Sequence, residues 1–239
     1  MTIEPNSFEF NLLFTLTIIL LITKIILSIY LAWEVRKKFI LTKKFSYDFL
    51  FSLFVLMLCL LISRLLWAYW DFYFTEFDPN RFYLSPGIFY WKIAALTMTL
   101  GLANFIFIID RKVMDFKLKG ILAYTMVIVA IIILFYPVNN SQDFEVVSSL
   151  LLLLNIVSIA IPVIFFYLGF KTPKFRMYFF SIAIGTILVA IGSNLVNEPI
   201  LVPLRNMFGI EILVVVYLLF LILKISGYVL ISYGVLKVI

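Results

Sequence analysis

The sequence predicts an all-α, polytopic membrane protein, formed by a single seven-helix transmembrane domain over residues 1–239. Its N-terminus is expected outside and its C-terminus in the cytoplasm. Composition, the lengths of the apolar runs and the placement of Lys and Arg predict this fold class. Of the 239 residues, 64% are hydrophobic and 13% are charged, and the mean hydropathy is +1.15. Soluble domains are about half apolar and about one-quarter charged, so we expect this chain in a membrane, and first of all in the cell membrane.

Seven apolar runs have roughly the 20 residues that a helix needs to cross the hydrocarbon core of a bilayer. They are residues 10–32, 47–70, 87–109, 119–137, 146–169, 176–197 and 211–236. The leader "MTIEPNSFEF" is acidic, and the run that follows it is too long for a signal peptide, so it is predicted to be the first span. The connections are short, and the longest outer one, residues 71–87, is aromatic and mixed in charge.

The basic residues between the spans are distributed unequally. Thirteen Lys and Arg residues lie in the connections and tail assigned to the cytoplasm, and only Arg81 and Arg205 lie on the other side. Because cytoplasmic loops carry an excess of Lys and Arg, this bias places the N-terminus outside. Nine of the thirteen acidic residues lie on the outer side. The net charge of +6 therefore reflects topology, and no nucleic-acid partner is expected.

The chain contains no histidine and a single cysteine, Cys59. The absence of histidine excludes histidine-based haem and zinc sites and histidine general bases. The sequence also has no glycine-rich phosphate loop and no metal-ligand spacing. We therefore predict no catalytic residues, no metal site and no cofactor, and the protein is not expected to be an enzyme.

Four basic residues lie inside the predicted spans: Lys24, Arg64, Lys92 and Lys224. A charge in the membrane costs about 2.5–3.5 kcal/mol on insertion scales, so each one requires an explanation. Arg64 and Lys92 lie near the outer surface, where they can extend toward water or pair with Asp71; alternatively they form the floor of a pocket for an anionic group. Lys24 and Lys224 lie deeper in their spans, and Lys224 is beyond the reach of a lysine from either end of its helix. We expect Lys224 to face the interior of the bundle or a hydrated cavity.

Polar side chains follow helical spacing in three of the spans. Asn104 continues a stripe with Thr97 and Gly101 in the third span, and Asn155 continues one with Ser158 and Pro162 in the fifth. The seventh span has a stripe formed by Tyr217, Lys224 and Tyr228. Such stripes occur in ordinary helix packing as well as in ligand sites, and both interpretations stay open. The predicted ligand-binding residues are Lys224, Lys92, Arg64, Asn104, Asn155, Tyr217, Tyr228 and Lys24.

Three stretches carry a resemblance: "SRLLWAYWDFY" (63–73), "GLANFIFIIDRKV" (101–113) and "KTPKFRMYFFSIAIGTILVAIGSNL" (171–195). With them, the layout from the second span onward resembles the seven-helix membrane sensor regions that lie N-terminal to the output domains of some prokaryotic histidine kinases. The resemblance implies a sensory function. Because the printed chain ends at Ile239, a separate partner is expected to receive the signal through the cytoplasmic loops.

The leading hypothesis is a membrane sensor or ligand-binding protein with an outward-opening pocket between spans two, three and seven. The excess of positive charge in the spans favours a small anionic or lipidic ligand. Two alternatives stay open. One is a transporter or channel for an anionic or lipidic substrate; the other is a non-catalytic subunit of a larger membrane complex, which would contact a protein partner through a helix face or through residues 71–87. In each case the lipid bilayer is a partner.

Overall fold

A computed structural model of the chain describes residues 7–43, 47–195, 203–204, 206–209 and 212–238. Every regular element among these residues is a helix, in agreement with the predicted fold class. The α-helices are α1 (Phe8–Thr42), α2 (Phe49–Tyr69), α3 (Gly87–Val113), α4 (Ile121–Phe135), α5 (Ser141–Ser158), α6 (Ala160–Lys171), α7 (Arg176–Leu195) and α9 (Ile212–Val238). The shorter elements are the π-helix η1 (Trp70–Thr75) and the 3₁₀ helices η2 (Pro79–Arg81) and η3 (Pro173–Phe175).

Five helical segments in the described part of the chain are long enough and apolar enough to cross a membrane. They are Phe8–Thr42, Phe49–Thr75, Gly87–Val113, Pro173–Leu195 and Val214–Val238. Their length and composition indicate a multi-pass membrane protein whose helices contact the bilayer. The other two predicted spans coincide with shorter helices, α4 with 15 residues and the pair α5 and α6. Seven spans therefore remain a prediction.

The predicted fifth span is divided at Ile159, between α5 and α6. Pro162 has no N–H to donate to the carbonyl of Ser158, and a proline ring clashes with the carbonyl four residues before it. The hydroxyl of Ser158 donates instead to the carbonyl of Leu154, at 2.9 Å. The proline thus accounts for the interruption of a helix that hydropathy alone predicts to be continuous.

Helix α1 continues about ten residues past the predicted end of the first span, through much of the basic segment that was expected to be a loop. Its later turns carry Lys38, whose ammonium lies 2.6 Å from the carboxylate of Asp48. Asp48 is also the N-cap of α2, because its side chain accepts a hydrogen bond from the backbone N–H of Phe51. One carboxylate therefore both begins α2 and binds the end of α1.

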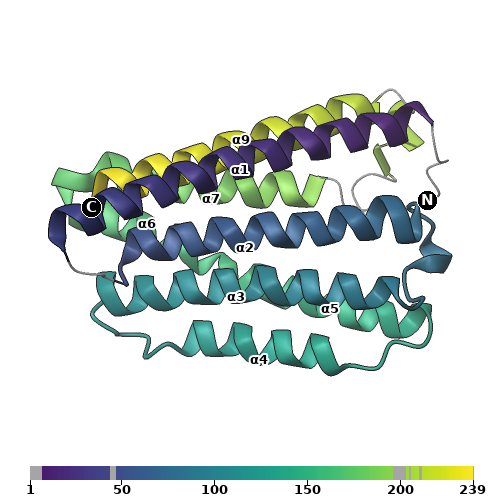
Figure 1. Cartoon of the computed structure of the whole chain (residues 1–239), viewed down its shortest axis with the longest axis horizontal. Coiled ribbons are helices and arrows are strands. Elements are labelled where there is room, and N and C mark those ends of the chain that lie inside the picture. Colours follow the sequence, from purple (N-terminus) through teal and green to yellow (C-terminus); the bar gives the residue numbers. More distant parts are fainter. Residues whose placement is uncertain (1–6, 44–46, 196–202, 205, 210–211, 239) are drawn as a thin grey trace. The chain divides into compact units, whose positions relative to one another are not determined.

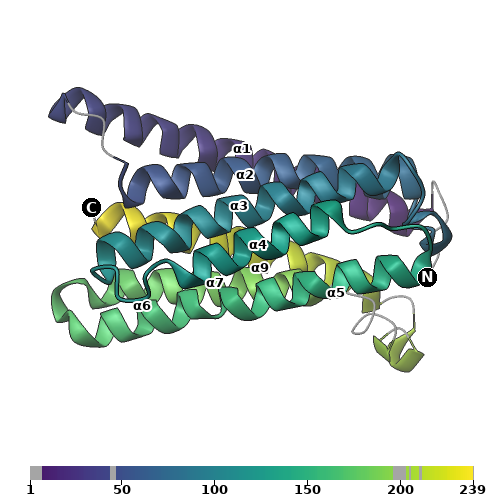
Figure 2. The same ribbon diagram turned by 90° about the horizontal axis from the view of Figure 1, so that it is seen from below.

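Two compact units divide the described residues. Unit 1 contains the chain up to Thr23 together with Ile161–Val238, and unit 2 contains Lys24–Ala160. Helix α1 thus contributes its first turns to unit 1 and its later turns to unit 2. In unit 2, α2, α3 and α4 lie side by side in chain order (Figures 1 and 2).

In unit 1, α7 and α9 run alongside each other with their backbones in contact at glycines (Figure 1). A Cβ on Gly227 would lie 2.6 Å from the carbonyl oxygen of Gly185, and a Cβ on Gly185 would lie 2.7 Å from the carbonyl oxygen of Gly227. The hydroxyl of Ser181 donates a hydrogen bond across the interface to the carbonyl of Leu230, at 2.9 Å. Small residues are what lets two membrane helices approach this closely.

In unit 2, a buried carboxylate organises the connection between α3 and α4. Asp110 accepts hydrogen bonds from the backbone N–H groups of Leu118, at 2.9 Å, and Gly120, at 2.7 Å. Gly120 has φ +73°, a left-handed conformation that glycine adopts without steric cost. Asp110 thereby sets where α4 begins.

Substitution of Gly227 by Ala is expected to destabilise the protein by roughly 1–3 kcal/mol, because the new methyl group would meet the rigid backbone of α7. Unfolding followed by circular dichroism in detergent measures the change. Val229→Ala on the exposed face of the same helix is the control, and it should stay within about 0.5 kcal/mol of the wild type. Equal stability of Gly227→Ala and wild type would show that α7 and α9 do not pack through these glycines.

Candidate functional site

Lys24 is almost completely buried, with 3% of its surface exposed. Its ammonium donates a hydrogen bond to the backbone carbonyl of Leu60 in α2, at 2.9 Å. A buried ammonium is stable only when hydrogen bonds replace those that it made with water. This contact is made to a main-chain oxygen. Lys24 therefore joins the later part of α1 to the middle of α2.

Lys92 lies near the start of α3, and its ammonium donates a hydrogen bond to the carbonyl of Tyr136, at 2.5 Å. Tyr136 is the C-cap residue of α4. The last carbonyls of a helix have no partner within the helix and carry partial negative charge, so a cation is favoured there. Lys92 thus caps a neighbouring helix, which is a structural role for a residue that was predicted to bind a ligand.

Arg64 and Asp71 form the ion pair that the sequence suggested, with 3.5 Å between the nearest nitrogen and oxygen atoms. Asp71 lies in η1, which continues α2 by six residues, so an acidic residue belongs to the same helical segment as Arg64. The second span predicted from the sequence ended at residue 70, so Asp71 was placed just outside it. Both side chains are about one-fifth exposed, at 19% and 18%.

Lys224 lies in α9 of unit 1, where its ammonium is 4.6 Å from the centre of the Phe220 ring. A ring face attracts a cation through its quadrupole. The stem of Lys224 packs on Gly192 of α7, since a Cβ there would lie 3.2 Å from the Lys224 Cγ atom. Tyr217 and Tyr228 are buried in the same helix, with 2% and 3% of their surfaces exposed.

Asn104 connects α3 to the beginning of α2. Its amide nitrogen donates to the hydroxyl of Ser52, at 3.1 Å, and its carbonyl oxygen accepts a hydrogen bond from the hydroxyl of Tyr47. Gly101, in the same stripe, packs on Cys59 of α2, where an added Cβ would lie only 2.6 Å from the cysteine Cβ. The stripe in the third span therefore packs α3 against α2. The side chain of Asn155 lies outside the described residues.

The predicted ligand-binding residues thus divide between the units. Arg64, Lys92, Asn104 and Lys24 belong to unit 2, and Lys224, Tyr217 and Tyr228 belong to unit 1. The pocket predicted between spans two, three and seven would require both units, and it remains a prediction. Within unit 2, Arg64 and Lys92 both lie close to the connection between α2 and α3.

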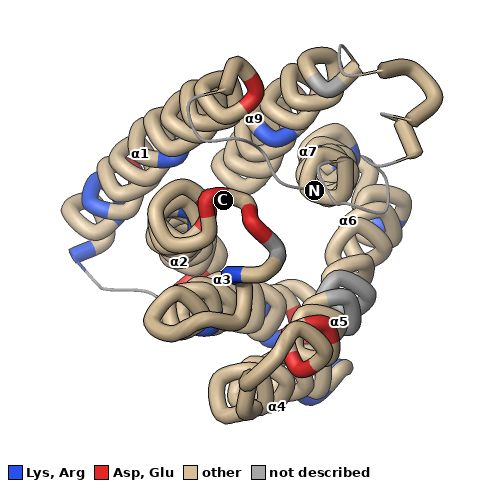
Figure 3. The backbone as a smooth tube through the Cα atoms, turned by 90° about the vertical axis from the view of Figure 1, so that its right-hand side faces the viewer, with Lys and Arg blue, Asp and Glu red and all other residues tan. Residues whose placement is uncertain are grey.

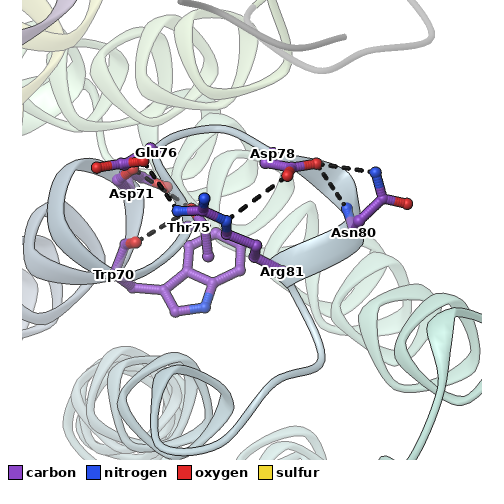
Figure 4. A network of polar contacts seen from close by, with 7 residues as sticks. All are labelled: Trp70, Asp71, Thr75, Glu76, Asp78, Asn80 and Arg81. Atoms are coloured by element: carbon purple, nitrogen blue, oxygen red, sulfur yellow. Dashed lines mark hydrogen bonds and ion pairs between the residues drawn. The ribbon is translucent and has the colours of Figure 1, made fainter. Parts of the chain in front are cut away.

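Residues 70–86, between α2 and α3, form a structured connection that we call the α2–α3 cap. Figure 4 shows its polar network, in which Arg81 contacts the carboxylates of Glu76, at 2.9 Å, and Asp78, at 3.6 Å. Asp78 also accepts hydrogen bonds from the backbone and side-chain nitrogens of Asn80, both at 3.0 Å. Glu76 and Phe77 have φ values of 50° and 59°, a left-handed conformation that is unfavourable without glycine. The network around Arg81 holds the chain in this tight turn.

Trp70 lies beneath this turn, with 7% of its surface exposed. Its ring centre is 4.9 Å from that of Phe82 and 6.1 Å from that of Phe144 in α5. The hydroxyl of Thr75 donates to the Trp70 carbonyl, at 3.1 Å, which ties the two ends of the π-helix together. The indole N–H of Trp70 is buried and has no acceptor among the described residues.

A buried donor of this kind costs about 1–3 kcal/mol when it has no partner. The indole N–H can only donate, so the group that would satisfy it must be a hydrogen-bond acceptor. Sequence reasoning missed Trp70 as a functional candidate, because a tryptophan near the membrane surface is typical of an interfacial anchor. The available signal was its position directly before Asp71, in a segment rich in aromatic and acidic residues.

Acidic residues gather at this end of unit 2. Figure 3 shows acidic segments, in red, after α2 and at the start of α5. The described residues contain no group of three or more His, Cys, Asp or Glu side chains that could hold a metal ion. The groups at this end that could contact a ligand are the buried indole N–H of Trp70 and the ion-paired guanidinium groups of Arg64 and Arg81. Aromatic side chains pack around Trp70.

The described residues and these contacts define an all-helical membrane protein in which one lysine, Lys24, is buried between α1 and α2. Comparison with protein families, with curated proteins and with solved structures finds no match to the chain.

Lys92→Met is expected to destabilise the protein by about 1.5–3 kcal/mol, the usual contribution of a hydrogen bond to a charged group. The substitution preserves the apolar stem but removes the donor from the end of α4. Lys112→Met, at the exposed end of the same helix, is the control and should have little effect. Chemical unfolding in detergent micelles measures both, and wild-type stability for Lys92→Met would rule out the capping role.

Proposed function

We propose that the chain is a seven-helix membrane sensor that binds a small anionic or lipidic ligand at the α2–α3 cap and has no catalytic activity. Its N-terminus lies outside, its C-terminus lies in the cytoplasm of the cell, and the α2–α3 cap faces outward. Ligand binding shifts the helices that begin and end at the cap, and the basic cytoplasmic loops pass this shift to a separate protein partner. The resemblance to the sensor regions of histidine kinases supports the same function.

The observation that carries the proposal is the buried indole N–H of Trp70, which has no acceptor among the described residues. A ligand carboxylate, phosphate or ester oxygen supplies that acceptor. Asp71 directly follows Trp70 and pairs with Arg64 at a nitrogen–oxygen distance of 3.5 Å, which is long for an ion pair with a hydrogen bond.

The π-helix η1 connects the proposed ligand site to the rest of unit 2, so a structural change on ligand binding can be transmitted through it. A π-helix is rare, occurs mostly as a single turn within or beside an α-helix, and is frequent at functional sites. In this chain η1 continues α2 directly and forms the first part of the cap, and the rest of the cap leads into α3. A change in the hydrogen bonds of Trp70 or Asp71 therefore acts on the ends of two adjacent helices.

The seven-span topology explains the charges on the connections that flank the shorter helices. Residues 110–119 before α4 and residues 171–176 at the end of α6 are basic, whereas residues 136–145, which lead from the end of α4 into the first turns of α5, contain two acids and no base. The positive-inside rule places the first two connections in the cytoplasm and the third outside. Helix α4 and the pair α5 and α6 then each cross the membrane once.

The topology can be tested by introducing single cysteines by the substitutions Lys117→Cys, Asn139→Cys and Lys171→Cys, in a Cys59→Ala background. Intact cells treated with a membrane-impermeant maleimide should label the Asn139 variant alone, because only its thiol lies outside. Labelling after permeabilisation is the control that all three thiols are accessible. If Asn139→Cys is protected in intact cells, or all three variants are labelled, the seven-span topology is wrong.

Ligand binding can be tested with acetate, succinate, inorganic phosphate and sulfate as probes in thermal unfolding of the purified protein. We expect at least one of them to raise the unfolding temperature of the wild type. Trp70→Phe keeps an aromatic ring but removes the N–H, so the dissociation constant for that anion should increase roughly tenfold or more.

The matched control is Trp33→Phe, the same change at an exposed position in α1. It should bind the anion as the wild type does. A shift in unfolding temperature that is identical in Trp70→Phe and wild type would contradict a role for the indole. If none of the four anions stabilises the wild type, the proposed anionic ligand class is wrong.

A further inference from the structure

An open groove of about 640 Å³ lies on the surface of unit 1. It runs over η3, the first turns of α7 and the last turns of α9, so it lies within one unit and far along the chain from the α2–α3 cap. Its lining changes in character along its length. Lys174 and Arg176 lie at one end, and Met177, Ile184, Leu230 and Tyr233 are among the residues that form its walls.

The basic end of the groove presents two exposed cations. In the described part of the chain no acidic side chain pairs with either Lys174 or Arg176. The described residues of unit 1 therefore do not neutralise the positive charge at this end of the groove through an ion pair.

Aromatic rings hold the guanidinium of Arg176 in place. It lies 5.4 Å from the ring centre of Phe170 and 5.3 Å from that of Phe180. A guanidinium stacked on rings keeps its edge N–H groups available for a phosphate, which it recognises in a two-pronged geometry. The ammonium of Lys174 lies 5.4 Å from the ring centre of Phe175, so both cations are positioned by neighbouring rings.

Beyond the cations the groove becomes apolar. Met177 is 72% exposed and Ile184 is 45% exposed. Both belong to a helix long enough to cross a membrane. Arg176 and Ile184 are separated by eight residues, or about 12 Å along the helix axis. The groove thus has cations at one end and an apolar wall further along. The separation of the two is comparable to the distance from the phosphate of a lipid to the first part of its acyl chain.

We propose that this groove is a binding site for an anionic phospholipid. The phosphate binds Arg176 and Lys174, and one acyl chain follows the apolar wall formed by Met177, Ile184 and Leu230. The site is separate from the ligand site of the proposed function and does not depend on it. Charge complementarity selects an anionic headgroup, and the exposed apolar wall selects a lipid over a soluble phosphate.

Native mass spectrometry of the full chain in detergent, titrated with phosphatidylglycerol or phosphatidylcholine, tests this site. The wild type should bind phosphatidylglycerol several-fold more tightly than phosphatidylcholine. In the double variant Lys174→Gln/Arg176→Gln we expect the affinity for phosphatidylglycerol to fall by about 10- to 30-fold, since each basic residue near a lipid phosphate contributes about a fivefold effect. The single variant Lys174→Gln should show the smaller effect, and it leaves the stacked arginine in place if the double variant fails to fold.

Arg111→Gln/Lys112→Gln is the matched control, because it removes the same charge from an exposed pair at the end of α3. It should bind phosphatidylglycerol within about twofold of the wild type. An equal loss in both double variants would show a non-specific effect of net charge and overturn the site. Glycerol 3-phosphate serves as a headgroup probe without acyl chains, and displacement of the lipid by this probe at equal concentration would also overturn the proposal.

Discussion

The structure depends on one constraint: polar groups in the hydrocarbon core must find their partners within the protein, because there is no water to supply them. Helices satisfy their own backbones, but their side chains and their ends need further partners. This chain meets part of the requirement with basic residues bound to main-chain carbonyls. Lys24 binds the middle of α2, and Lys92 binds the end of α4.

A main-chain carbonyl is a suitable partner for a buried ammonium, since it accepts a hydrogen bond without introducing a second charge. A carboxylate partner would have to be desolvated as well, and the desolvation of both ions offsets much of their attraction. The Arg64–Asp71 pair lies at the end of its helical segment and is about one-fifth exposed, where that penalty is smaller.

The two units solve helix packing in different ways. In unit 1 the backbones of α7 and α9 meet at Gly185 and Gly227, so the interface depends on the absence of side chains. In unit 2 the helices are also joined by polar side chains, including Asn104 between α3 and α2 and Asp110 between α3 and the start of α4. The α2–α3 cap belongs to the unit with the more polar interfaces.

The sequence predicted the elements better than their connections. Apolar runs predicted the helices because length and hydropathy are local properties, and the Arg64–Asp71 pair was predictable from its short separation. The partners of Lys24 and Lys92 were not, since every helical residue has a carbonyl and no residue type marks the one that a lysine reaches. The π-helix escaped prediction for a similar reason: it arises from how the end of α2 packs, and so the burial of Trp70 beneath the turn could not be foreseen.

The division of α1 between the units has a consequence for the order in which the protein can be assembled. Unit 2 occupies one continuous stretch of chain, so its helices can pack against their predecessors as each leaves the ribosome. Unit 1 combines the first turns of α1 with helices that follow Ile161, so it cannot form until those later helices have been synthesised. The first turns of α1 are therefore made before unit 2 but reach their final packing partners only after it.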